Sequence, residues 1–188
     1  MNARIISTAM CIALFAAATL FHAVPLRAQE EGAELALADA LYDQGDYRQA
    51  IEAYDLALIR LLENPLTLHR MAFALLQLDR YERARAVLER FIEVMPDEPI
   101  GHYNLGVLYW HTGRHYLAIP CFENIVARDS TYADAWTCLG YIYLETGQIE
   151  KAWEMQARLL VLQHEDAFRL QMEIMREEQA RNDPTAEW

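Results

Sequence analysis

The chain has few of the residues on which catalytic and phosphate-binding motifs depend. Its 188 residues include only three cysteines, seven glycines and six prolines. No glycine-rich phosphate loop and no nucleophile elbow occurs among them. The scarcity of these motifs argues against an enzyme built on a common phosphate-binding or hydrolase pattern.

Positive charge is also scarce. The 16 basic residues, of which Lys151 is the single lysine, face 28 acidic residues, so the formal net charge is −12. This balance argues against binding nucleic acid through phosphate neutralisation. It leaves two interpretations open: the acidic surplus keeps the domain soluble, or it meets a basic partner. The 54% hydrophobic content is enough to fill a core, which excludes disorder for most of the chain.

The first 28 residues are predicted to be a signal peptide that is cleaved after Ala28. No acidic residue precedes Glu30, and an early arginine is followed by an apolar run from Ile5 to Phe21. Cleavage would remove two arginines and leave a formal charge of 14 − 28, or −14. The chain is therefore expected in an exported compartment, periplasmic or secreted. The alternative is a membrane anchor formed by residues 5–26, because about 20 apolar residues span a bilayer.

Two cysteines, Cys121 and Cys138, remain after the leader. An oxidising compartment would allow a disulfide between them. The other interpretation treats them as small buried apolar side chains, a common fate of unpaired cysteine.

The sequence repeats itself with a constant period of 34 residues, the distance from Gly113 to Gly147, and without an insertion. Gly45-Asp46-Tyr47-x2-Ala50 aligns with Gly113-Arg114-His115-x2-Ala118 and with Gly147-Gln148-Ile149-x2-Ala152. The same position of the unit is held by Ala50, Ala84, Ala118 and Ala152, and a second one by Leu37, Met71, Leu105 and Leu139. A third position holds Tyr54, Leu88 and Phe122, and Gln156 interrupts it.

Each unit contains two apolar patterns of helical spacing, separated by a glycine or an aspartate that suits a turn. In the third unit, for example, helices are expected over about Pro99–Thr112 and His115–Ala127. The recurring alanine lets the two helices approach closely, so a bulky residue at Ala118 should disrupt their packing. The fold class predicted is all-α, a row of helical hairpins.

The repeat resembles the tetratricopeptide repeat. Trp136-x2-Leu139-Gly140-x2-Tyr143 matches the pattern that opens such a repeat, and His102-x2-Leu105-Gly106-x2-Tyr109 repeats it one unit earlier. The resemblance implies a right-handed superhelical solenoid of four helix-turn-helix units. The units are residues 31–64, 65–98, 99–132 and 133–166, followed by a capping helix at 167–181 and a flexible tail at 182–188.

No residue set is expected to catalyse a reaction or to hold a cofactor. His102, His111 and His115 lie in one unit, but Thr112-Gly113 separates the last two and should break the helix, so they need not share a face. We therefore expect no metal site, no cofactor and no enzyme activity. A redox protein using Cys121 and Cys138 is the least favoured alternative.

Resemblance to the family implies that the concave face, lined mainly by the first helix of each hairpin, binds peptides or helices. Carried over by position, the predicted binding residues are Tyr42, His69, Phe73, Tyr103, Asn104, Val107, Trp110 and Tyr141. Only Arg70 and Asn104 fit the carboxylate clamp of some relatives, so an apolar or aromatic segment is the expected partner. The alternative is that four units form no deep groove and that aromatics such as Trp110 pack against their neighbours.

The predicted function is thus a non-catalytic scaffold that binds a protein or peptide segment. A structural solenoid that associates with itself through its open ends is the alternative. Contact with a membrane is expected only if the N-terminal segment is retained.

Overall fold

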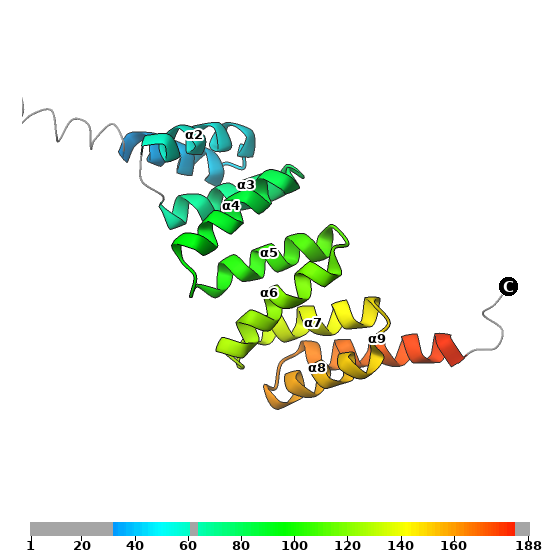
Figure 1. Ribbon diagram of the computed structural model, residues 1–188. Helices are drawn as coiled ribbons and strands as arrows, with labels where there is room; N and C mark the ends of the chain where they lie inside the picture. The colour runs from blue at the N-terminus through cyan, green and yellow to red at the C-terminus, as the bar shows by residue number, and fades with distance from the viewer. Residues whose placement is uncertain (1–31, 61–63, 183–188) are drawn as a thin grey trace, which may run out of the picture. The chain divides into compact units, whose positions relative to one another are not determined.

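The computed structural model describes residues 32–60 and 64–182. Within those ranges the chain consists of helices and short connections, with no strand (Figure 1). None of the helices found there has the length and apolar character needed to cross a membrane. The predicted signal peptide, the alternative anchor at 5–26 and nearly all of the predicted tail lie outside the described residues.

Helices begin at the same positions of the repeat unit throughout the described chain. Residues 32–43 form the first helix. The helices that follow are α2 (Tyr47–Arg60), α3 (Pro65–Gln77), α4 (Tyr81–Val94), α5 (Pro99–His111), α6 (His115–Arg128), α7 (Ala133–Glu145), α8 (Ile149–Val161) and α9 (Asp166–Asn182). The helices α2, α4, α6 and α8 start one full repeat apart, and so do α3, α5 and α7. The predicted fold class, an all-α repeat of helical hairpins, is confirmed.

The described helices are grouped into two compact units, which are divided between Arg80 and Tyr81. In the first unit α2 packs against α3. In the second, each helix from α4 to α9 packs against the next, and α7 also contacts α5 and α9. Consecutive antiparallel packing of this kind is how a repeat protein buries faces that a single hairpin would leave exposed.

Alanine at the recurring position is buried in each of α2, α4, α6 and α8. Ala50, Ala84, Ala118 and Ala152 are all fully buried, as the sequence predicted. The second recurring position differs between hairpins. Met71, Leu105 and Leu139 are buried, whereas Leu37 is 58% exposed. The helix at 32–43 has no described helix before it that could cover Leu37.

Glycine in the repeat pattern makes room for a neighbouring side chain. A Cβ atom on Gly106 would lie 2.8 Å from Cζ of Phe122, so the phenyl ring packs directly on the α5 backbone. At Gly140, one unit later, the space is taken by Leu170 of α9. Residue 156, at the position of Phe122, is a buried glutamine whose Nε2 atom lies 3.4 Å from the carbonyl oxygen of Ala167. Helix α9 thus supplies the apolar contact that Gln156 does not, which is the role of a capping helix.

Turns inside the hairpins require a left-handed backbone. Gly113, between α5 and α6, has a φ of 72°, a conformation that glycine adopts without steric cost. Asp79 occupies the same position of the unit and has a φ of 55°. Aspartate tolerates this region better than most residues, which explains how it replaces glycine there.

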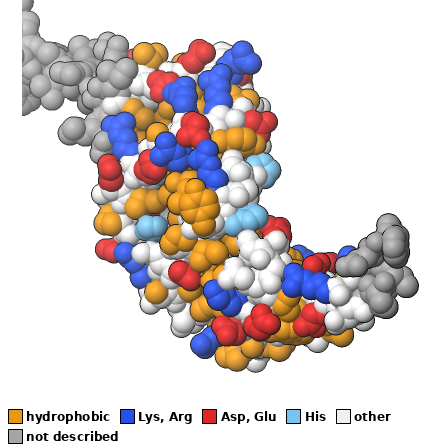
Figure 2. All heavy atoms as spheres, turned by 45° about the vertical axis from the view of Figure 1, so that its right-hand side comes forward, with side chains coloured by type: hydrophobic (Ala, Val, Ile, Leu, Met, Phe, Trp, Pro, Cys, Tyr) orange, Lys and Arg blue, Asp and Glu red, His pale blue; other side chains and the backbone are white. Residues whose placement is uncertain are grey.

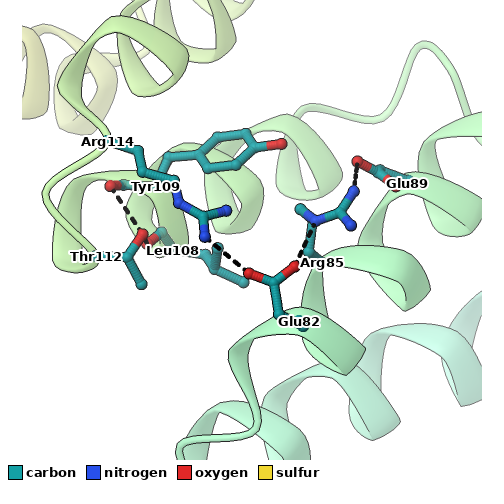
Figure 3. A network of polar contacts seen from close by, with 7 residues as sticks. All are labelled: Glu82, Arg85, Glu89, Leu108, Tyr109, Thr112 and Arg114. Carbon is teal, nitrogen blue, oxygen red and sulfur yellow. Dashed lines mark hydrogen bonds and ion pairs between the residues drawn. The ribbon is translucent and has the colours of Figure 1, made fainter.

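Polar contacts join α4 to the turn that follows α5 (Figure 3). Glu82 accepts hydrogen bonds from Arg114, at 2.8 Å, and from Arg85, at 3.2 Å. Arg85 also reaches Glu89, at 2.7 Å. The hydrogen bonds and charges of Arg114 and Arg85 hold the pKa of Glu82 below its usual range. Both arginines therefore already have carboxylate partners within the second unit.

Candidate partner-binding surface

Aromatic side chains on α5 and α7 form the core of the candidate surface in the second unit. The rings of Trp110 and Tyr141 are stacked, with centroids 6.3 Å apart and planes inclined by 17°. Both side chains are half-buried. They project from helices that contact each other directly, so the repeat places them side by side.

Glu145, at the end of α7, connects this pair to the start of α6. Its Oε2 atom accepts a hydrogen bond of 2.6 Å from the indole Nε1 of Trp110. The same oxygen lies 3.4 Å from Nε2 of His115, the first residue of α6. Because Tyr141 and Glu145 are four residues apart, they share one face of α7.

A cavity of about 420 Å³ opens beside these residues and is lined by Val107, Trp110, His111 and Glu145. Two of the four side chains are apolar or aromatic, and one carries a negative charge. His111 is held at its edge by Tyr81, whose hydroxyl oxygen lies 3.2 Å from the imidazole Nε2. Figure 2 shows exposed hydrophobic side chains bordered by histidines on the face that it displays.

Aromatic side chains also cluster in the first unit. Tyr42, Tyr47 and Phe73 meet edge to face, with centroids 5.7 to 6.2 Å apart. The guanidinium of Arg70 lies 5.5 Å from the centroid of the Tyr42 ring. It also lies 2.9 Å from Oδ1 of Asp39, so its charge is paired within the unit. Phe73 remains 39% exposed.

Tyr103 packs inside the second unit and is not among the residues that line the cavity. Its ring contacts those of Phe122 and Tyr132, with centroids 5.8 and 6.0 Å away. Burial raises its pKa, and its hydroxyl lies 3.9 Å from the sulfur of Cys138. Its contacts are those of a packing residue. The structure therefore brings together Val107, Trp110 and Tyr141 from the predicted set but places Tyr103 in the packing around them.

The two remaining predicted positions, His69 and Asn104, are half-buried. Burial lowers the pKa of His69, with the charge of Arg70 acting in the same direction. His69 lies on α3 and Asn104 on α5, each the first helix of its hairpin, as the pattern predicted.

Cys121 and Cys138 are free thiols in the structure. Each sulfur has its own local contact: Cys121 donates to the carbonyl oxygen of Leu117, and Cys138 faces Tyr103. Burial raises the pKa of both thiols to about 11. A raised pKa disfavours the thiolate, which is the reactive form of cysteine, so the geometry does not favour a redox role.

Sequence reasoning missed Glu145. The sequence nonetheless contains a pattern that points to Glu145. This residue stands four residues after Tyr141 and one full repeat after His111, at the same position of the unit. His111 and Glu145 both line the cavity. No group of three metal-ligating side chains converges within residues 32–60 and 64–182.

The fold and the surface define a helical repeat protein with an aromatic face on successive first helices. Family models described as tetratricopeptide repeat match residues 41–108, 101–132 and 121–154. The chain is a tetratricopeptide repeat protein.

Curated relatives share this repeat over part of their length. The chain is 32% identical over 111 residues to tetratricopeptide repeat protein 21A of Mus musculus, which covers 57% of this chain and 8% of the mouse protein. It is 27% identical over 96 residues to anaphase-promoting complex subunit CDC16 of Saccharomyces cerevisiae, covering 47% of this chain and 11% of that protein. The match thus spans about a tenth of these relatives.

Solved structures share the fold at low identity. The solved chain of MamA from Desulfovibrio magneticus RS-1, described as 41-end, is 20% identical with a TM-score of 0.65, covering 81% of this chain and 97% of that one. A tetratricopeptide repeat protein from Parabacteroides merdae is 15% identical with a TM-score of 0.76, covering 82% of this chain and 62% of that one. YrrB, described as a TPR protein with an unusual peptide-binding site, is 21% identical with a TM-score of 0.62, covering 81% of this chain and 75% of YrrB.

Proposed function

We propose that the protein is a non-catalytic scaffold that binds a segment of another protein on the surface formed by α5 and α7. The observation that carries the proposal is the stacked pair Trp110 and Tyr141 beside an open cavity. Tryptophan and tyrosine are the side chains that most often dominate the energy of protein interfaces. The description of YrrB as a peptide-binding protein of the same fold is consistent with this role.

The proposed place of action is an exported compartment, periplasmic or secreted, and the signal-peptide pattern of residues 1–28 supports it. The partner would present an extended or helical segment that inserts side chains into the cavity, one of the recurring ways in which proteins recognise peptides.

Affinity capture from the host envelope tests the proposal. The full chain is compared with a Trp110→Ala/Tyr141→Ala variant and with Tyr116→Ala, whose ring lies on α6 and is 75% exposed. We expect a protein that is captured by the wild type and by Tyr116→Ala but lost by the double variant, with unchanged helical content by circular dichroism. Equal capture by all three forms would place the working surface elsewhere and refute the proposal.

A second candidate function is self-association, and α9 provides the observation that favours it. Phe168, Met172 and Met175 are 68%, 51% and 40% exposed and follow each other at helical spacing. An uncovered apolar stripe of this kind is typical of a contact surface. Light scattering over a range of concentrations tests this candidate: a Phe168→Glu/Met172→Glu variant should dissociate any oligomer, and a wild type that stays monomeric would exclude it.

A further inference from the structure

The cavity beside Trp110 has the composition of a site for a positively charged group. Its wall combines the indole of Trp110, the methyl groups of Val107 and the imidazole of His111 with the carboxylate of Glu145. A cation over an aromatic face is attracted by the negative potential of the ring, and tryptophan gives the strongest such attraction. A carboxylate at the edge adds a charged acceptor.

The carboxylate of Glu145 has no lysine or arginine partner among the described residues. Both of its recorded contacts, from Trp110 and from His115, use Oε2. A histidine carries a full charge only when it is protonated. The Oε1 atom is therefore left for a donor from outside.

The arginines of the surrounding helices are already paired. Arg114 lies 2.8 Å from Glu82, and Arg169 lies 2.9 Å from Asp166. Neither has a recorded contact with Glu145. Because the chain as a whole carries a formal charge of −12, a cationic group approaching the cavity is also attracted at longer range.

The first unit contains an aromatic pair at the equivalent positions, with a cation and a carboxylate of its own beside it. Tyr42 and Phe73 stand two full repeats before Trp110 and Tyr141. There, Arg70 lies over the Tyr42 ring and pairs with the carboxylate of Asp39. The residue two repeats after Arg70 is Cys138, which is buried and carries no cation. The aromatic pair of the second unit thus lacks the guanidinium that covers the equivalent pair of the first.

We propose that the cavity beside Trp110 and Glu145 binds the guanidinium of an arginine side chain in the partner segment. The inference rests on the proposed function and names the chemistry of its partner. Arginine fits better than lysine, because its guanidinium is planar, weakly hydrated and able both to stack on an indole and to donate to a carboxylate.

Titration with a pair of short peptides tests the proposal on the full chain. The probes are acetyl-Ala-Leu-Arg-Leu-Ala-amide and the same peptide with citrulline in place of arginine, which keeps the shape and removes the charge. The readout is the indole N–H resonance of Trp110 in a ¹⁵N-labelled chain, identified by its loss in Trp110→Phe. The indole N–H donates to Glu145, so a group that binds the carboxylate should shift the resonance of this N–H.

The arginine peptide should bind at least about tenfold more tightly than the citrulline peptide, a difference of roughly 1.4 kcal/mol. Glu145→Gln, which keeps an oxygen acceptor for the indole, should abolish this preference. Glu150→Gln, which removes an exposed carboxylate from the first turn of α8, should retain it. Raising the salt concentration should weaken binding of the arginine peptide to the wild type and leave the citrulline peptide unaffected.

Two results would overturn the inference, and they differ in what they mean for the proposed function. Equal binding of both peptides with a shift at Trp110 would show a peptide surface without a cation site, so the proposed function would stand. If neither peptide shifts the Trp110 resonance at the highest concentration at which it dissolves, the cavity does not bind arginine. The capture experiment, which assumes nothing about basic residues, would then decide the proposed function separately.

Discussion

Two aromatic pairs occupy equivalent positions of the repeat and have different surroundings. Tyr42 and Phe73 in the first unit meet edge to face at 64°, with centroids 5.8 Å apart. Trp110 and Tyr141 in the second are stacked at 17°, with centroids 6.3 Å apart. The repeated backbone therefore decides where an aromatic pair stands but not how its rings are oriented.

The neighbours of each pair decide whether it is already covered. Asp39 and Arg70 supply a carboxylate and a cation to the first pair, whereas their counterparts two repeats later are Val107 and Cys138. The first pair thus binds a cation of its own chain, and the second borders a cavity. In a repeat protein, two substitutions at equivalent positions can turn an internal contact into a candidate site for a partner.

Phe122→Ala should have the largest effect on the second unit, because it removes the ring that packs on the α5 backbone. Phe122 is fully buried, lies on Gly106 and contacts Tyr103, so its removal leaves a cavity under α5. We expect a loss of about 3–5 kcal/mol in the free energy of unfolding, the usual cost of truncating a buried phenylalanine. Urea titration followed by tryptophan fluorescence measures it, because all four tryptophans belong to the second unit.

Tyr116→Ala is the matched control, since its aromatic ring lies on the same helix but is 75% exposed. Its free energy of unfolding should change by no more than about 0.5 kcal/mol. A loss below about 1 kcal/mol for Phe122→Ala would mean that the packing of Phe122 on α5 contributes little to the stability of the second unit.

Periodicity in the sequence was sufficient to predict the fold. The recurring alanines and the turn residues are spaced by one repeat, and a helical hairpin buries the same position in every repeat, so Ala118 and its equivalents could be recognised as core. The exposure of Leu37 could not, because the repeat pattern describes a unit with neighbours on both sides. Its exposure depends on which helices are present beside it.

The candidate site could be predicted only in part. Periodicity places both Tyr103 and Trp110 on the same face of α5. It cannot tell that Tyr103 packs on Phe122 while Trp110 borders a cavity. That difference depends on side-chain directions and on residues from two other helices. Glu145 was missed because its role comes from a hydrogen bond across α5 and α7 rather than from its own unit.

Arg70→Met should have a smaller effect and sharpens the comparison, because it removes from the first pair the guanidinium that the second pair does not have. The substitution keeps an apolar stem over Tyr42 and removes the ion pair with Asp39. Because the two charged side chains are 27% and 29% exposed, solvent screening limits the expected loss to about 1 kcal/mol in the free energy of unfolding. Urea titration followed by circular dichroism measures this loss, since the first unit contains no tryptophan.

Methylguanidinium at concentrations below those that denature the protein should recover part of this loss, because it can replace the missing group between Asp39 and the Tyr42 ring. Arg48→Met, which removes an exposed arginine of α2, should show neither the loss nor the recovery. Recovery would show that an aromatic pair with a nearby carboxylate in this repeat binds a guanidinium from solution. A loss without recovery would mean that a guanidinium binds there only when it is part of the chain. The likeness between the two aromatic pairs would then not extend to ligand binding.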